Sequence, residues 1–283
     1  MRPFAVAAAL SRRVLRALIA LSLLLQAVSV FGHEGLHELI DAQNKKVEKA
    51  PSDPALRFEL ASLYGSHGEL ELALINLDRV DALAPGKFPT DLVRSQAFLV
   101  VGDFTKAKAA LDRQLASHPE NPLAWLLRAR AERQLGQDKA SLADFREALK
   151  RTPSPDPDLI QEVADALATR GFQDEAAQVL AAGLEKLGHI PSLVLRALDL
   201  EVASKNFDAA LRRVAEMQKD APRPEPWMAR RAAILAQAGR TDESRAAWKA
   251  LSDHLASLPA PERSSHAMTQ FADEARQALA STK

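Results

Sequence analysis

Small and large apolar residues return along this chain in a pattern that repeats every 34 residues. The interval is marked by Gly68, Gly102 and Gly136, and we number each unit so that its glycine is position 15. Position 20 is then always small: Ala73, Ala107, Ser141, Ala176, Ala210 and Ser244. Position 24 is always large and apolar: Leu77, Leu111, Phe145, Leu180, Val214 and Trp248. A small side chain lets one helix lie close to another, and a bulky one a turn later fills the space beside it. The pattern therefore predicts pairs of packed helices.

The same register divides most of the chain into six units, each predicted to hold two helices. Their bounds are 54–87, 88–121, 122–155, 157–190, 191–224 and 225–258, with Asp156 as one extra residue. Position 15 should end the first helix in left-handed backbone, which glycine adopts without steric cost, although the fifth unit carries Lys205 there. Proline at position 32 should end the second helix in most units. Proline-rich segments at 153–157 and 222–226 predict either a change of stacking angle or a hinge.

One further helix is predicted on each side of the repeats. Residues 33–52 are expected to form an N-terminal capping helix, whose apolar stripe is Leu36, Leu39, Ile40 and Val47. Residues 259–283 are expected to hold a C-terminal capping helix at about 262–279, whose stripe is Met268, Phe271, Ala275 and Leu279. Each stripe should face the neighbouring repeat, because the end of an open stack has to meet water.

The units resemble the tetratricopeptide repeat (TPR) family in their interval, in their small residues at position 20 and, apart from Leu198, at position 8, and in their closing prolines. The resemblance covers residues 54–258 and implies an all-α fold, a right-handed superhelical solenoid of helix-turn-helix repeats. The chain departs from the family at position 7, where Arg94, Arg128 and Arg231 replace large apolar residues. It departs again at position 11, with Glu132 and Glu201. The alternative is a non-repetitive helical bundle. A composition with 47% hydrophobic but only 5% aromatic residues also favours an all-α protein.

The first 32 residues predict an export signal. Four arginines precede an apolar run at 17–31, which is shorter than the roughly 20 residues that a membrane-spanning helix needs. We therefore expect removal of this segment, after Gly32 or Ser29, rather than a stable membrane anchor. The segment Ser11-Arg12-Arg13 also resembles a twin-arginine signal, so both export routes stay open. Either route predicts a periplasmic or secreted protein.

Charge and cysteine content exclude several classes of function. The full chain has 37 basic and 37 acidic residues, and removal of residues 1–32 would leave 33 basic against 37 acidic residues. Nucleic acid is therefore not an expected partner, because its binding needs a basic face. The chain has no cysteine, which excludes disulfides, thiolate metal sites and thiol catalysis.

The stretch from His33 to His37 matches H-E-x-x-H, the motif in which zinc peptidases use two imidazoles and a glutamate base, here Glu34. Such a site also needs a third protein ligand, and the motif lies at the predicted start of the exported chain. A second interpretation is that cleavage after Gly32 frees the amine of His33, which could chelate copper or zinc together with His37. The third is a solvated helix start with no cofactor.

Catalysis is not predicted, since no nucleophile elbow and no glycine-rich phosphate loop is present. The resemblance implies instead that the first helix of each unit lines a concave groove through positions 2, 5, 9, 12 and 13. The partner-binding residues expected from those positions are Phe58, Leu92, Gln96, Leu126, Arg130, Arg133, Asp165 and Asp199. Arg130 and Arg133 would form a basic patch, with an acidic end beyond it. The prediction is a non-enzymatic scaffold or adaptor of the cell envelope that binds a peptide or protein carrying an acidic group near an apolar anchor.

Overall fold

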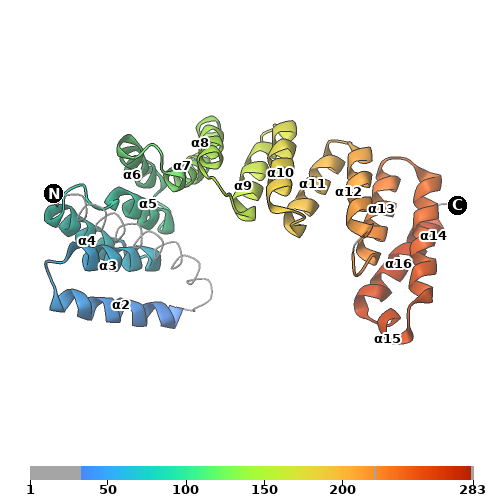
Figure 1. Ribbon diagram of the computed structural model, residues 1–283, viewed down its shortest axis with the longest axis horizontal. Coiled ribbons are helices and arrows are strands. Elements are labelled where there is room, and N and C mark those ends of the chain that lie inside the picture. The colour runs from blue at the N-terminus through green and yellow to red at the C-terminus, as the bar shows by residue number, and fades with distance from the viewer. Residues whose placement is uncertain (1–32, 220, 282–283) are drawn as a thin grey trace, which may run out of the picture. The chain divides into compact units, whose positions relative to one another are not determined.

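The computed structural model describes residues 33–219 and 221–281, and every regular element within those ranges is a helix (Figure 1). The chain divides into two compact units between Pro153 and Ser154, inside the first proline-rich segment. The predicted export signal at 1–32 lies outside the described residues. The all-α prediction is confirmed.

The first unit is a succession of helical hairpins preceded by one helix. Its helices are α2 (His33–Lys49), α3 (Pro54–His67), α4 (Leu70–Leu83), α5 (Thr90–Val100), α6 (Phe104–Ser117), α7 (Pro122–Gln134) and α8 (Asp138–Arg151). The second unit continues the pattern of paired helices. Its helices are α9 (Pro157–Ala168), α10 (Gln173–Leu187), α11 (Pro191–Ala203), α12 (Phe207–Lys219), α13 (Glu225–Gln237), α14 (Thr241–Ser257), α15 (Ala260–Arg263) and α16 (His266–Ser281).

Helix ends follow from local chemistry at the unit borders. The side chain of Asp53 accepts hydrogen bonds from the backbone N–H groups of Ala55 and Leu56, at 2.8 and 3.3 Å, and Pro54 opens α3. Asn121 caps α7 in the same way, again with proline at the first helical position. These caps satisfy N–H groups that have no partner inside the helix, and the proline gives up no helical hydrogen bond there.

The turn inside each hairpin has the left-handed backbone that its register predicts. Glycine at position 15 has a φ of 86° at residue 68 and of 71° to 86° at residues 102, 136, 171 and 239. Lys205 has a φ of 59° at the same position, and it is the only residue other than glycine with positive φ in the described chain. The repeat therefore imposes this conformation even on a residue that disfavours it.

The small residues of the repeat lie where helices touch. Every residue at position 20 is buried, and alanine there is wholly inaccessible in four hairpins. Where serine takes the position, its hydroxyl donates to the carbonyl oxygen of position 8: Ser141 to Ala129 and Ser244 to Ala232, both at 2.8 Å. The hydroxyl is thus satisfied inside the hairpin, so Ser substitutes for Ala without leaving a buried polar atom unpaired.

The arginines at position 7 do not shift the register of the first helices. Arg94 donates to Asp78 and Asp81 of the preceding hairpin at 2.6 and 2.7 Å. Arg128 likewise donates to Asp112 of the preceding hairpin at 2.8 Å, and to Asp144 of its own hairpin at 2.6 Å. At Arg94 and Arg128, an ion pair between successive hairpins therefore replaces the apolar contact of the family pattern.

The terminal helices differ in detail from their prediction. Leu36, Ile40 and Val47 of α2 pack against Leu60 and Leu63 of α3. Leu39, however, is 46% exposed, so its place in the predicted stripe is wrong. The buried face of α2 continues instead through Gln43, whose amide donates to the Leu56 carbonyl oxygen and to Glu59 at 3.0 and 2.9 Å.

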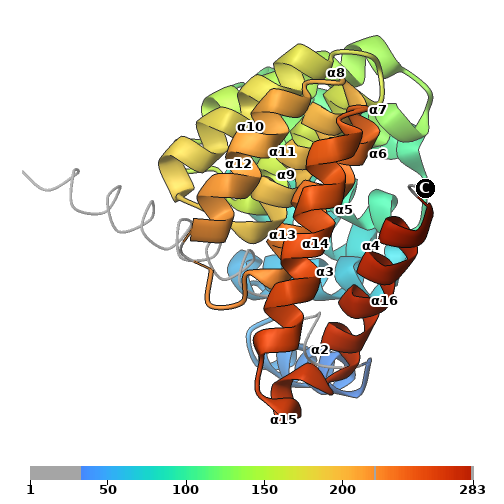
Figure 2. The same cartoon turned by 90° about the vertical axis from the view of Figure 1, so that its right-hand side faces the viewer.

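At the other end, the single predicted helix is divided between α15 and α16 by Ser264 and Ser265. Figure 2 shows α16 beside α14, with which it is in contact. Met268 of α16 is buried against Leu251 and Leu255 of α14, as its stripe predicts.

Candidate functional site

The predicted groove residues of the first unit come from the first helices of its three hairpins. Helix α3 contacts α5, and α5 contacts α7. Together the three helices carry Phe58, Leu92, Gln96, Leu126, Arg130 and Arg133. The five residues on α5 and α7 lie on helices that contact each other, but not all six predicted residues lie on the surface.

Phe58 and Leu92 are core residues rather than partner-binding residues. Their exposed fractions are 3% and 1%. The ring of Phe58 lies 5.2 Å from that of Phe88 and packs against Leu77 of the second helix of its hairpin. Leu92 packs with Leu111 in the same manner. Position 5 therefore faces the partner helix in these two hairpins, so the prediction that it lines an open groove is wrong for them.

Gln96, Leu126, Arg130 and Arg133 remain half-buried, with part of each side chain open to solvent. Arg130 and Arg133 are three residues apart on α7, a spacing that puts them on one side of the helix. The guanidinium of Arg133 lies 5.6 Å from the centre of the Phe145 ring, a distance at which the ring face attracts a cation. The predicted basic patch thus consists of two half-buried arginines beside Leu126. We call Gln96, Leu126, Arg130 and Arg133 the α5–α7 patch.

The predicted acidic end is neutralised in the second unit. Asp165 of α9 pairs with Arg196 of α11, and Asp199 of α11 pairs with Arg230 of α13. Each pair joins position 9 of one hairpin to position 6 of the next. These carboxylates therefore link neighbouring hairpins and do not form an open acidic surface. The arginine at position 6 lies 31 residues further along the chain, and this spacing is the signal by which the pairing could have been predicted.

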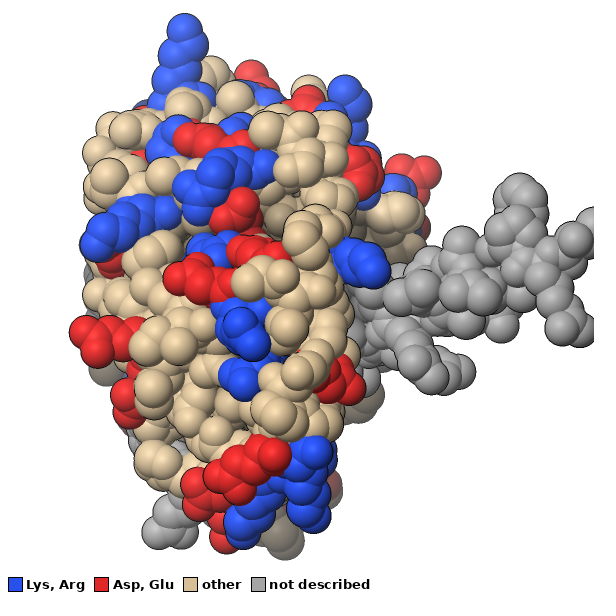
Figure 3. All heavy atoms as spheres, turned by 90° about the vertical axis from the view of Figure 1, so that its left-hand side faces the viewer, with Lys and Arg blue, Asp and Glu red and all other residues tan. Residues whose placement is uncertain are grey.

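A charged cluster lies on α6, α7 and α8 around Glu132, whose exposed fraction is 3%. Burial, and then the charge of Asp144, raise the pKa of Glu132 from its ordinary 4.5 to about 7. The ammonium group of Lys108 lies 3.8 Å from one carboxylate oxygen of Glu132. Arg128 instead engages Asp112 and Asp144, and these bonds raise the arginine's pKa although burial opposes the rise. Figure 3, which faces the end of the first unit, shows acidic and basic side chains interleaved on that surface.

The predicted metal residues lie at the start of α2. The side chains of His33 and Glu34 fall outside the described part of the structure. The ring of His37 lies 4.4 Å from the ring of His67 on α3, edge to face, a neighbour that the spacing of the histidines did not reveal. Among the described side chains, no group of three or more His, Asp or Glu residues is placed to hold a metal ion.

Within residues 33–219 and 221–281, none of the helices combines the length and the apolar character that crossing a bilayer requires.

The hairpins, their left-handed turns and their recurring small residues define an all-α helical repeat protein. A family model of the tetratricopeptide repeat matches residues 92–155, from the third residue of α5 to just beyond α8. This match and the helical hairpins support a tetratricopeptide repeat protein. No curated protein matches it.

Several solved structures resemble the chain. YrrB, a TPR protein with an unusual peptide-binding site, shares 23% identity over 64% of this chain and 94% of that chain, with a TM-score of 0.49. A tetratricopeptide repeat protein from Parabacteroides merdae shares 16% identity over 90% and 98% of the two chains, with a TM-score of 0.47. MamA from Desulfovibrio magneticus shares 16% identity over 61% and 93%, with a TM-score of 0.45.

A TPR fold is a scaffold for interactions between proteins, and TPR proteins bind protein or peptide partners. Members of the family are typically not enzymes.

Proposed function

We propose that this chain is a non-enzymatic scaffold or adaptor of the cell envelope that binds a peptide or another protein on the α5–α7 patch. The observation that carries the proposal is the pair Arg130 and Arg133, half-buried on one side of α7 next to Leu126. Partly buried guanidinium groups hold carboxylates through charge-assisted hydrogen bonds, and a neighbouring apolar side chain offers an anchor. The expected ligand is an acidic segment with an apolar residue close to its carboxylate.

The envelope location rests on residues 1–32, whose arginines and short apolar run are typical of an export signal. We propose a periplasmic or secreted protein that keeps no membrane anchor once this segment is removed. Mass spectrometry of the first residue of the chain isolated from periplasm or medium tests this, and an intact residue 1 in a membrane fraction would contradict it.

The groove proposal is tested by reversing both charges, Arg130→Glu with Arg133→Glu, and comparing the proteins captured from envelope extract by the wild-type and altered chains. We expect partners captured by the wild type to be lost, because a carboxylate would then meet two negative charges. Circular dichroism should remain helical, since both side chains are partly exposed.

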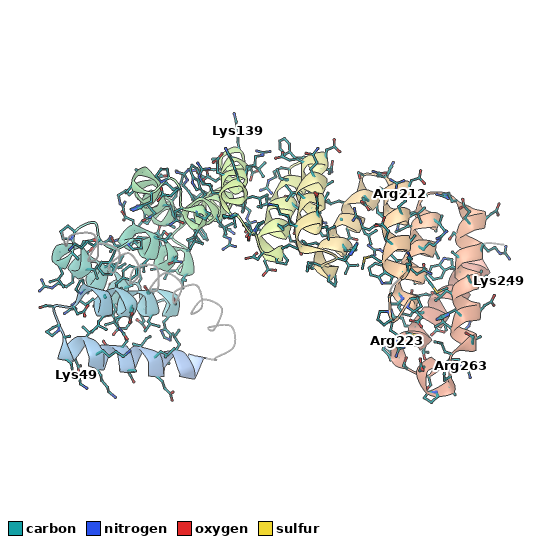
Figure 4. The ribbon with its side chains drawn as sticks, in the orientation of Figure 1. Lys49, Lys139, Arg212, Arg223, Lys249 and Arg263 are labelled. Carbon is teal, nitrogen blue, oxygen red and sulfur yellow. The ribbon has the colours of Figure 1, made fainter. Side chains whose placement is uncertain are left out.

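The matched control is Lys139→Glu with Lys150→Glu on α8, which makes the same charge change at two exposed positions (Figure 4 labels Lys139). The control should capture the same partners as the wild type. If the wild type and the Arg130/Arg133 variant captured the same partners equally well, the binding surface would have to lie outside the α5–α7 patch.

A metal-binding role for the exported N-terminus is the second candidate, favoured by the imidazole of His67 beside His37. We propose that the amine and imidazole of His33, together with His37, bind copper or zinc, since these nitrogen donors suit both ions. Calorimetric titration of a chain that begins at His33 with Cu²⁺ is the test, and a chain extended by one N-terminal alanine is the control. Equal affinity of the two would contradict it. Peptidase chemistry through H-E-x-x-H would instead require activity that is lost in Glu34→Gln.

A further inference from the structure

The second unit contains a pocket of about 360 Å³ among α12, α13 and α14. Apolar side chains form most of its lining: Met228, Leu235, Ala246, Ala247 and Ala250. Its polar lining residues are Gln218, Arg231 and Glu243. Helix α12 is the second helix of one hairpin, and α13 and α14 form the next hairpin. The pocket lies where these three helices meet. It is distinct from the α5–α7 patch, which belongs to the other unit.

Arg231 stands at position 7, the same place in its hairpin as Arg94 and Arg128 in theirs. Those two arginines are held by carboxylates, and their side chains are only 14% and 18% exposed. Arg231 is exposed and makes no ion pair among the described residues. The second unit therefore has an arginine at position 7 that lacks the carboxylate partners of the equivalent arginines in the first unit.

Each carboxylate that accepts a hydrogen bond from Arg94 or Arg128 is replaced at the corresponding place around Arg231. Position 25 of the preceding hairpin, which is Asp78 or Asp112 in the first unit, is Ala215. Position 28 of the preceding hairpin, which is Asp81 for Arg94, is Gln218. Position 23 of the same hairpin, which is Asp144 for Arg128, is Ala247. The residues at these places are neutral, and two of the three are alanine. Two of them, Gln218 and Ala247, line the pocket together with Arg231.

The acidic residue in the pocket lining does not replace those partners. Arg240 binds both carboxylate oxygens of Glu243, at 2.7 and 2.6 Å. These hydrogen bonds, and to a smaller extent the charges of Arg240 and Arg231, lower the pKa of Glu243, so its carboxylate stays charged and hydrogen-bonded to Arg240 rather than to Arg231. Arg231 therefore keeps its hydrogen-bond donors available on the pocket side.

We propose that this pocket binds a glutamate side chain presented by a partner peptide, which supplies from outside the carboxylate that other hairpins supply from within the chain. The carboxylate would pair with Arg231, and the methylene groups of the glutamate would lie on Met228, Leu235 and the alanines of α14. Charge complementarity and the filled equivalents at Arg94 and Arg128 carry the assignment.

The test measures binding of a blocked peptide, N-acetylated and C-amidated Ala-Leu-Glu-Ala, to the full exported chain, against the same peptide with Gln in place of Glu. We expect the Glu peptide to bind about tenfold more tightly, the difference that a charge-assisted pair makes. Arg231→Gln should abolish the difference, and so should Ala247→Asp, which restores the acid found at position 23 of the third hairpin.

Two matched controls should keep the difference: Ala247→Asn, which adds bulk without charge, and Arg212→Gln, which removes an exposed arginine of α12 outside the pocket (Figure 4). Equal binding of the two peptides, absence of saturable binding, or discrimination that survives Arg231→Gln would overturn the proposal.

Other occupants would also overturn it. Competition by free glutarate at the peptide's own affinity would identify a small dicarboxylic acid as the ligand. Dimers of the wild-type chain in sedimentation, lost in Arg231→Gln, would identify a second copy of this chain. Failure of the peptide test would leave the α5–α7 proposal standing, because Arg130 and Arg133 take no part in it.

Discussion

At the residue scale, Lys205 carries a strain that its equivalents avoid. It has a φ of 59° where five other hairpins have glycine. For a residue with a Cβ atom this conformation costs about 1 kcal/mol, because the Cβ approaches the neighbouring carbonyl oxygen. The packing of the hairpin compensates, since the first helix has to reverse direction at this point.

Replacing Lys205 by glycine should therefore stabilise the second unit. We expect Lys205→Gly to raise the free energy of unfolding by about 0.5–1 kcal/mol, measured by urea denaturation. Lys205→Ala is the control and should bring no gain, because alanine keeps the Cβ atom. Equal stability of the Gly and Ala variants would show that the turn is not strained.

Glu132 is a second residue in an unfavourable environment, because its surroundings destabilise the charged form of its carboxyl group. Its pKa is raised from 4.5 to about 7, so the folded chain still holds this proton at pH values where the unfolded chain has released it. The sign follows from proton binding: the folded state binds more protons between these two values, so stability falls as pH rises through them.

We expect Glu132→Gln to remove this pH dependence. The wild type should lose roughly 1–3 kcal/mol of stability relative to Glu132→Gln between pH 5 and pH 8. The measurement is urea denaturation of both proteins at the two pH values. The difference in stability between the two proteins at one pH cancels the contributions of other titrating groups. A difference that stays constant with pH would mean that Glu132 ionises normally.

At the element scale, helices are held together by two recurring devices. Within a hairpin, a small residue at position 20, and at position 8 in every hairpin except that of Leu198, allows close approach. Ser141 and Ser244 add a hydrogen bond across the hairpin. Between hairpins, an arginine at position 7 reaches the second helix of the preceding hairpin, as Arg94 and Arg128 do. The first device depends on shape and the second on charge, so substitutions affect them differently.

Ala107 tests the first device, because its side chain is wholly inaccessible between α5, α6 and their neighbours. Ala107→Leu should lower the free energy of unfolding by about 1–3 kcal/mol, since the added carbons have no space. Ala109→Leu makes the same change at an exposed position of α6 and should cost far less. The measurement is chemical denaturation of both variants. Equal losses of stability in the two would contradict the role of Ala107 in helix packing.

At the scale of the whole molecule, the chain consists of two units, and the hydrophobic clusters found among the described residues each draw their members from within one unit. Repeat proteins gain stability from contacts between neighbours, so a unit with its own clusters can fold by itself. Asp91 with Arg113 and Gln43 with Glu59 are polar links of the same local kind, at 2.6 and 2.9 Å.

Residues 33–153, produced alone, should therefore fold into a helical protein with a cooperative thermal transition. Ala107→Leu should lower its melting temperature about as much as it lowers that of the corresponding transition in the full chain. Circular dichroism on heating is the measurement. A fragment without a cooperative transition would mean that the first unit depends on the second.

The amino-acid sequence by itself determined the repeat interval, the left-handed turns and the buried small residues, because each of these recurs at a fixed chain separation and meets the same neighbours in every hairpin. The sequence identified Arg130 and Arg133 as a basic patch, but it did not predict which side chains surround them. The tertiary structure alone decided that Phe58 and Leu92 are core, that Asp165 and Asp199 are paired, and that Arg231 faces a pocket. Those outcomes depend on which side chains the adjacent helices present at one point in space. The repeat interval determines where the helices lie along the chain. Only the packing of those helices determines which neighbours each side chain contacts.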